Sequence, residues 1–459
     1  MRRRDFLGAA LAGPAVRRPN IVFLYSDDQA AWSLRHAGNP QAYTPNIDRI
    51  CREGAYFTNS FVTTPVCSPA RASLMTSRYA LEVGFEDYLS PDQDAAKGLD
   101  PAIPNWPSAL KAAGYRTGLV GKWHLGYQPR FHPTRLGFEY FAGFLGGGSG
   151  PMDPTLEVEG QTREMRGSTP DIFTAFGLDF IRRHRAGPFL LSIHYREPHA
   201  SNAPNLTGSA RTWLPLPGED WGRFKDLEPK IPNPDYPDLD TGQVRRMMRE
   251  YLASVGCLDR NVGRVLALLD ELGLARDTVV VFTADNGMNM GHHGIWHKGN
   301  GRWILRGNKG ERPNLYDQSL RVPAAVRWPG HIRPGTAIHQ TITNLDWFPT
   351  LLGVAGVPVP KESAIRGRDL GPLMAGTRPP WRNDLYVEYN LRNGARADLR
   401  AWRTKDWKLI RDLRNGGRDE LYHLARDPGE TTNLIDSKDP EPRRVKEQFT
   451  AILAKGYPA

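Results

Sequence analysis

A cysteine that directly precedes a predicted helix is the first residue of this sequence that could do chemistry. Cys67 is followed by Ser68 and Pro69, and 70–75 has the composition of a helix. Because proline is favoured at the first helical position, the helix is predicted to begin at Pro69. Cys67 would then lie beside its positive end, with Arg71 one turn further on. Such surroundings lower the pKa of a thiol and attract anions. The alternative is a small, buried and inert cysteine.

Oxygen-bearing side chains follow two predicted strands. The segments 20–25 and 278–284 are continuously apolar, as expected of strands buried on both faces of a parallel sheet. The polar side chains just beyond them are Asp27, Asp28, Asp285 and Asn286. Open α/β sheets bind ligands beyond the carboxyl ends of their strands, and oxygen ligands suit Ca²⁺ or Mg²⁺ rather than zinc or copper. The alternative for the two adjacent aspartates is a capping carboxylate beside a solvated one.

Basic side chains occupy loops predicted at the same edge of the sheet. They are Arg71, Lys122, His124, His199 and Lys298. A lone lysine or histidine in a loop is usually solvated, but Lys122 and His124 are flanked by glycines after a third predicted strand. A divalent cation with several cationic side chains is what in-line displacement at an anionic group requires, because together they stabilise the charge that spreads over its oxygens.

The composition narrows the class of protein. The chain has 459 residues, of which 40% are hydrophobic, enough for one large domain and a smaller one. Its formal charge of +10 favours an anionic ligand, whereas no basic run or RNA-binding signature is present, so we expect no nucleic acid partner. The three scattered cysteines form neither a disulfide framework nor a metal motif. No segment reaches 18 uninterrupted apolar residues, so we expect no membrane span.

Strand patterns alternate with helix patterns over most of the chain, which predicts an α/β fold with a large, mostly parallel sheet sandwiched by helices. Further strands are predicted at 56–62, 116–120, 189–195 and 322–328, and helices at 44–54, 103–114, 171–185, 243–272 and 343–356. The glycine-rich segment 146–150 is predicted to be a hinge or lid, and 202–241 a long loop.

The pattern changes beyond residue 377. Short strands at 384–388, 401–403, 407–411 and 420–424 predict an antiparallel sheet, and a helix follows from about 442 to 454. We therefore expect a catalytic α/β domain at 19–377 and a small α+β domain at 378–459.

The first residues have the composition of an export signal. Paired arginines precede Phe6 and Leu7, and a weakly apolar run extends to Val16. This pattern is typical of a bacterial twin-arginine signal, so we expect an export signal at 1–18 and a periplasmic or secreted protein. The alternative is a basic tail.

Together these motifs resemble the formylglycine-dependent sulfatases of the alkaline-phosphatase superfamily. The resemblance covers nearly the whole chain from Asn20 onward. The central element is Cys67-Ser68-Pro69-Ala70-Arg71, and further matches lie at 25–28, 44–48, 121–124, 285–287, 420–422 and 427–428. Ser77 departs from the family, which usually has glycine there.

The resemblance implies that a formylglycine-generating enzyme converts Cys67 to Cα-formylglycine, whose hydrate attacks sulfur. It also implies a divalent cation, Ca²⁺ with Mg²⁺ as the alternative, held by Asp27, Asp28, Cys67, Asp285 and Asn286. Arg71 would orient the diol. Lys298 and His199 would act on the leaving oxygen, and His124, with Lys122 nearby, would remove the second hydroxyl proton.

Several alternatives stay open at this stage. Lys309 competes with Lys298 as the lysine that reaches the substrate. A phosphonate or phosphodiester hydrolase would use a nearly identical site, and a non-catalytic binder of sulfated glycans belongs to a third class. The basic pI of about 9.5 and the predicted export favour a sulfated polysaccharide or its oligosaccharides over a sulfated small molecule. The sequence predicts no oligomeric state.

Overall fold

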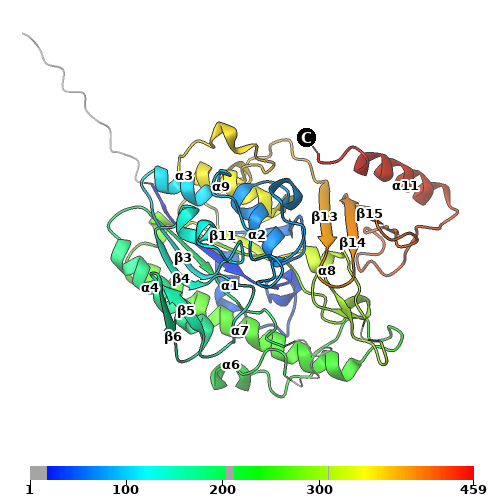
Figure 1. The fold of residues 1–459 in the computed structure, drawn as a ribbon, viewed down its shortest axis with the longest axis horizontal. Coiled ribbons are helices and arrows are strands. Elements are labelled where there is room, and N and C mark those ends of the chain that lie inside the picture. The colour runs from blue at the N-terminus through cyan, green and yellow to red at the C-terminus, as the bar shows by residue number, and fades with distance from the viewer. Residues whose placement is uncertain (1–17, 203–210, 309, 459) are drawn as a thin grey trace, which may run out of the picture.

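The computed structural model describes residues 18–202, 211–308 and 310–458. In this part of the chain a ten-stranded sheet has the order β12-β2-β11-β8-β1-β7-β3-β4-β5-β6 (Figure 1). Its strands are β1 (Asn20–Ser26), β2 (Ala55–Phe61), β3 (Arg116–Lys122), β4 (Tyr140–Phe144), β5 (Thr155–Val158), β6 (Gln161–Glu164), β7 (Phe189–His194), β8 (Thr278–Ala284), β11 (Ala324–Arg327) and β12 (Thr336–Thr343).

The centre of this sheet is parallel. β1 pairs in parallel with β8 on one side and with β7 on the other, and β7 pairs in parallel with β3. Four neighbouring strands therefore end at the same edge. The loops that begin there carry most of the polar residues that the sequence analysis selected.

Helices cover both faces of the sheet, and the alternation along β1 explains why. Ile21, Phe23 and Tyr25 face one hydrophobic cluster, and Val22 and Leu24 face the other. Helices α2 (Cys67–Thr76), α3 (Trp106–Ala112), α9 (Trp347–Val354) and α10 (Gly371–Met374) pack on the first face, and α1 (Pro45–Glu53), α4 (Thr169–His184) and α7 (Thr241–Glu271) on the second. The expected α/β sandwich is confirmed.

The C-terminal segment forms a separate antiparallel sheet, as expected. Its order is β13 (Leu385–Leu391), β14 (Ala397–Arg403), β15 (Lys408–Asp412) and β16 (Glu420–Tyr422), followed by α11 (Pro440–Leu453). The division of the chain at 377 stays a prediction. Short elements complete the fold: α6 (Gly218–Gly222), α8 (Asp317–Leu320) and the two-stranded β9 (Ile295–Trp296) and β10 (Arg302–Trp303).

The helix after Cys67 begins two residues earlier than predicted, because Val66 is its N-cap and Cys67 its first residue. Proline is tolerated at Pro69 since first-turn N–H groups have no helical acceptor.

Residues 1–17 of the expected export signal lie outside the described residues. None of the described helices is long and apolar enough to cross a membrane.

A buried ionic cluster joins the C-terminal sheet to the main domain. Lys408 Nζ on β15 lies 3.0 Å from Asp317 Oδ1 on α8 and 2.7 Å from Glu430 Oε1. Arg403 Nη2 also contacts Asp317, at 2.8 Å. The Lys408 side chain is fully buried, so its removal would leave Glu430 unpaired inside the protein.

We expect Lys408→Met to lower the free energy of unfolding by about 3–5 kcal/mol, because breaking a buried ion pair strands the remaining charge. Urea unfolding of the purified variant measures this. Lys405→Met is the matched control, since Lys405 is exposed in the preceding turn and surface substitutions change stability by no more than about 0.5 kcal/mol. Equal unfolding midpoints for the two variants would contradict the prediction.

Candidate active site

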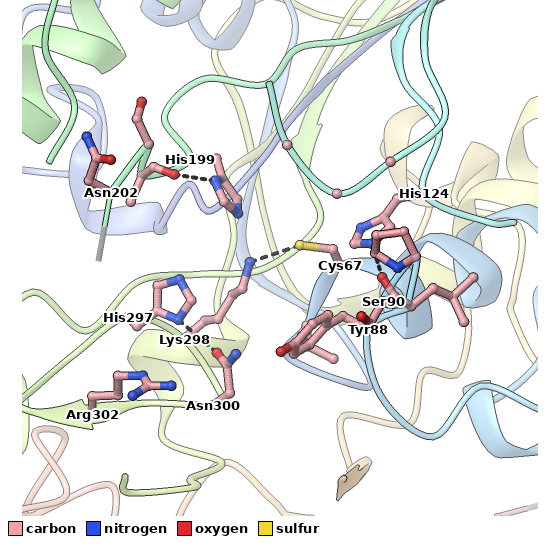
Figure 2. A pocket seen from close by; sticks show the side chains of 18 of the residues that line it. Cys67, Tyr88, Ser90, His124, His199, Asn202, His297, Lys298, Asn300 and Arg302 are labelled. Carbon is pink, nitrogen blue, oxygen red and sulfur yellow. Dashed lines mark hydrogen bonds between the residues drawn. The ribbon is translucent and has the colours of Figure 1, made fainter. Parts of the chain in front are cut away.

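A pocket of about 570 Å³ opens at the carboxyl ends of the parallel strands. Cys67 lines it together with residues of five other segments (Figure 2). These segments contribute Tyr88, Leu89, Ser90 and Pro91; His124 and Tyr127; Gly146, Gly147 and Gly148; His199 to Asn202; and Trp296, His297, Lys298, Asn300 and Arg302.

Buried carboxylates and buried cations alternate below the pocket. Arg71 Nε donates to Asp285 Oδ2 at 3.0 Å, and Arg71 Nη2 lies 3.6 Å from Asp27 Oδ2. Lys122 Nζ contacts the same Asp27 oxygen. Burial alone would raise the pKa of Asp27, but Lys122, His199 and Arg71 hold it well below its ordinary value. Asp27 is therefore ionised although no solvent reaches it.

Asp28 is the second buried carboxylate. Lys298 Nζ contacts its Oδ1, to which Asn286 Nδ2 also donates at 2.8 Å. Its backbone N–H donates to Asp285 Oδ1 at 3.1 Å, which links the ends of β1 and β8. Burial favours the neutral acid, but Lys298 and His199 lower the pKa of Asp28 below its usual range.

The donor set fits a hard divalent cation. Ligand atoms of Asp27, Asp28, Cys67 and His199 all lie within 4.8 Å of one another. Asp28 Oδ2 and Asn286 Oδ1 are buried and have no hydrogen-bond partner among the described residues. Two buried oxygens without partners in a region rich in carboxylates are what a bound Ca²⁺ or Mg²⁺ would satisfy.

Cys67 lies between this group and the pocket. Its Sγ is 3.6 Å from Asp27 Oδ1 and accepts from Lys298 Nζ at 2.9 Å. Burial, with the Asp27 charge, raises the pKa of the Cys67 thiol to about 12. The expectation that the helix start lowers this pKa is wrong, because desolvation and a neighbouring carboxylate outweigh the helix and the lysines.

Two histidines face one oxygen of Asp28. The Nε2 atoms of His199 and His297 each lie 3.8 Å from Asp28 Oδ2. Their Nδ1 atoms donate to neighbouring acceptors, the Ala200 carbonyl at 2.7 Å and Asn300 Oδ1 at 2.9 Å. Both rings thus direct Nε2 toward the site. Sequence reasoning missed His297, although it directly precedes Lys298. In the structure His297 has a left-handed φ of 77°.

His124 lies on another side of the pocket, under the glycine-rich segment. Its Nε2 donates to the Leu89 carbonyl at 2.9 Å, which leaves Nδ1 as an acceptor without a partner among the described residues. Burial and the Lys122 charge lower its pKa well below the ordinary histidine value. A Cβ on Gly147 would lie 2.7 Å from His124 Cε1, so this glycine permits the segment to close over the ring.

All ten residues selected from the sequence meet in this region. The structure also brings in residues that sequence reasoning missed or left undecided, among them Tyr88, His297, Asn300 and Arg302. Lys298 reaches both Asp28 and Cys67, whereas Lys309, its competitor, lies outside the described residues. Catalytic and metal-binding roles for these side chains stay predictions.

Comparison with protein families identifies the chain. The sulfatase family model matches residues 19–357, and the model for the C-terminal part of N-sulphoglucosamine sulphohydrolase matches residues 311–456. The chain belongs to the sulfatase family. Members of this family hydrolyse sulfate esters and generally use formylglycine and a divalent metal. This sulfatase has a possible metal-binding group that includes Asp27, Asp28 and Cys67.

Individual sulfatases resemble it over most of their length. It is 26% identical to N-acetylglucosamine-6-O-sulfatase of Bacteroides thetaiotaomicron, over 91% of this chain and 83% of that protein. It is 30% identical to N-acetylgalactosamine-6-sulfatase of Sus scrofa, over 91% and 81%. The solved structure of BT4656 with its substrate D-glucosamine-2-N,6-O-disulfate superposes with a TM-score of 0.80 at 25% identity, covering 96% of this chain and 97% of that one.

We expect Gly147→Ala to lower kcat for sulfate ester hydrolysis by about 100-fold, because the added methyl group must displace the His124 ring. Steady-state kinetics on an aryl sulfate measures the change. Gly148→Ala is the matched control, since its Cβ would meet no atom within 4 Å. If both variants kept wild-type kcat, the position of His124 would not matter for turnover.

Proposed function

We propose that this sulfatase removes a sulfate ester from a sulfated carbohydrate, with Cys67 as the precursor of its nucleophile. The position of Cys67 supports the proposal most directly. It is the first residue of a helix, it faces a 570 Å³ pocket, and it contacts both Asp27 and Lys298. A thiol with a pKa of about 12 is a poor nucleophile at neutral pH, so the side chain needs conversion before it can act.

Conversion of Cys67 to Cα-formylglycine would supply a hydrated aldehyde in place of the thiol. A serine at this position would form a sulfate ester that itself needs hydrolysis, whereas a geminal diol can expel sulfate as it returns to the aldehyde. The required partner is a formylglycine-generating enzyme, which acts during maturation. The element from Cys67 to Arg71 is the segment that this enzyme would recognise.

The neighbouring side chains have geometry suited to distinct roles. Arg71 orients the nucleophile through the carboxylates that it contacts, and Lys298, next to Cys67, stabilises charge on the sulfate oxygens. His199 directs Nε2 toward the site and would protonate the leaving oxygen once Nε2 carries a proton, since the neutral ring holds its proton on Nδ1. His124 accepts the remaining hydroxyl proton at Nδ1, and Lys122 holds Asp27 ionised beside it.

The same acidic group would hold the divalent cation. Asp27, Asp28, Asp285 and Asn286 would supply its oxygen ligands, and the residue at position 67 would supply another. A bound cation would polarise the sulfate oxygens. Ca²⁺ is favoured over Mg²⁺ because the ligands are numerous oxygens on several segments, which suits a large and flexible coordination sphere.

The pocket has the mixed character of a sugar site. Aromatic side chains of Tyr88, Tyr127 and Trp296 line it together with the polar side chains of Asn300 and Arg302. Aromatic faces pack against sugar rings, and a few placed polar groups fix their orientation. The similar N-acetylglucosamine and N-acetylgalactosamine 6-sulfatases and the glucosamine disulfate complex support a sulfated sugar. Export to the periplasm or the medium would give access to sulfated polysaccharides.

We expect Cys67→Ala to abolish turnover of sulfate esters while leaving the melting temperature close to that of the wild type, because it removes only a buried sulfur. The Cys67 peptide of active protein should weigh about 18 Da less than the unmodified peptide, from conversion of the thiol to an aldehyde. Enzyme assays and peptide mass spectrometry test both points. Full activity in Cys67→Ala would exclude this mechanism, and faster turnover of an aryl phosphodiester than of an aryl sulfate would favour phosphodiester hydrolysis.

We expect a chelator to lower both activity and melting temperature, because the buried carboxylates lose their cation. Returning Ca²⁺ at about 100 times its dissociation constant should restore about 2.7 kcal/mol of stability. Differential scanning calorimetry with Ca²⁺ and with Mg²⁺ ranks the two ions. Asp28→Asn should no longer respond to either ion, and a melting temperature indifferent to metal in the wild type would argue against a resident cation.

A further inference from the structure

The turn between β13 and β14 of the C-terminal sheet holds one segment of the substrate pocket. The backbone N–H groups of Arg392 and Asn393 donate to Asp87 Oδ2 at 2.8 and 2.9 Å. The Tyr389 hydroxyl donates to Asp87 Oδ1 at 2.9 Å, and Asn393 Nδ2 donates to the Tyr88 carbonyl at 3.0 Å. Tyr88 lines the pocket (Figure 2), so the C-terminal sheet contributes to the shape of the pocket.

The same turn also holds a second pocket segment through Glu311. The Ala395 backbone N–H donates to Glu311 Oε2, and Glu311 Oε1 lies 2.8 Å from Arg302 Nη2. Gly394 permits this approach, because its φ is +108° and a Cβ at this position would overlap the Glu311 carboxylate. The backbone of the turn therefore holds the Glu311 carboxylate in place, and the carboxylate in turn holds the Arg302 guanidinium.

Arg302 presents its guanidinium at the pocket. Its side chain is 23% exposed, and it lies near Asn300 and Lys298 on the pocket wall (Figure 2). Among the described residues, the guanidinium has no hydrogen bond or ion pair other than the one with Glu311. Its remaining N–H groups are donors that a ligand in the pocket can use.

The ion pair between Arg302 and Glu311 affects which substrate groups the remaining N–H groups of Arg302 can bind. Lys298 and Arg302 line the pocket, and each is paired with a carboxylate, that of Asp28 and that of Glu311. A second anion on the substrate beside Arg302 would also lie close to the Glu311 charge, whose repulsion offsets the attraction of the guanidinium. An uncharged oxygen meets no such repulsion and still accepts a hydrogen bond.

We propose that Arg302 hydrogen-bonds an uncharged oxygen of the sugar, a hydroxyl or an acetamido carbonyl, and that Glu311 is the positioning residue through which the pocket disfavours a second anionic group there. The preferred substrate is then a sugar with one sulfate ester and neutral neighbouring groups. This inference rests on the proposed carbohydrate substrate. Because Arg302 is held in place before binding, little side-chain entropy is lost when the sugar binds.

The test compares two variants on matched sugars. N-acetylglucosamine 6-sulfate and N-acetylgalactosamine 6-sulfate are each paired with the N-sulfated counterpart that carries a second anion, and an aryl sulfate serves as the reference. Glu311→Gln keeps the shape and removes the charge, so we expect the ratio of kcat/KM for the disulfated over the monosulfated sugar to rise about tenfold, with the aryl sulfate unchanged. Arg302→Ala should raise KM for the monosulfated sugar more than KM for the aryl sulfate, which has no sugar oxygen to accept a hydrogen bond there.

Glycine variants test the role of the turn without touching the pocket. Gly394→Ala should raise KM for the monosulfated sugar, because the added methyl group would displace the Glu311 carboxylate that positions Arg302. Gly417→Ala is the matched control, since it carries similar strain, with φ +74°, in another turn of the same sheet and its Cβ would meet no atom within 4 Å. Thermal unfolding checks that each variant is folded.

The outcomes separate this inference from the proposed function. An unchanged substrate ratio in Glu311→Gln, with wild-type protein active on the aryl sulfate and on a monosulfated sugar, would overturn the inference alone. A parallel loss on sugars and aryl sulfate would also overturn it, because it would show a merely structural role for Glu311. If wild-type protein cleaved the aryl sulfate but no sugar, the carbohydrate substrate would fail and the inference with it.

Discussion

The structure depends on the burial of three carboxylates, Asp27, Asp28 and Asp285, at the ends of two adjacent parallel strands. Ionised groups in such a place are costly unless each has a partner. Arg71, Lys122 and Lys298 supply three positive charges, and backbone and amide N–H groups supply further bonds. The charges of these six side chains therefore balance, and the oxygens of Asp28 and Asn286 that are left without partners are suited to a divalent cation, which would in turn attract an anionic substrate.

The parallel register of the sheet makes this arrangement feasible. Strands β8, β1, β7 and β3 are neighbours in the sheet, and the loop after each of them begins at the same edge. Helix α2 begins near this edge, with Cys67 in its first turn. Fixing these polar side chains in the interior is unfavourable in free energy. Burial of the large hydrophobic clusters on both faces of the sheet offsets this. The rigid scaffold is what allows several short loops, distant in sequence, to hold reacting groups in a fixed geometry.

The C-terminal sheet also contributes to the shape of the pocket, although it is separate from the ten-stranded sheet. The buried cluster around Lys408 fastens it to the main domain, and its β13–β14 turn reaches the pocket through Asp87 and Glu311. The proposed catalytic residues and the proposed residues for substrate selection therefore lie on different elements. In the proposed roles, loops of the parallel sheet hold the reacting groups, whereas the β9–β10 hairpin and the C-terminal turn shape the space in which a sugar would bind.

The sequence by itself determined the family, the alternation of strands and helices, and the candidate polar residues, because continuous apolar runs and short motifs are local signals. It missed β4, β5, β6 and β12, and it could not show that β11 runs antiparallel, since strand pairing depends on distant segments. Only the tertiary structure decided that the Cys67 thiol has a raised pKa, that His297 joins the site and that Glu311 neutralises Arg302. Burial and charge pairing are properties of the folded surroundings, which no single stretch of the chain contains.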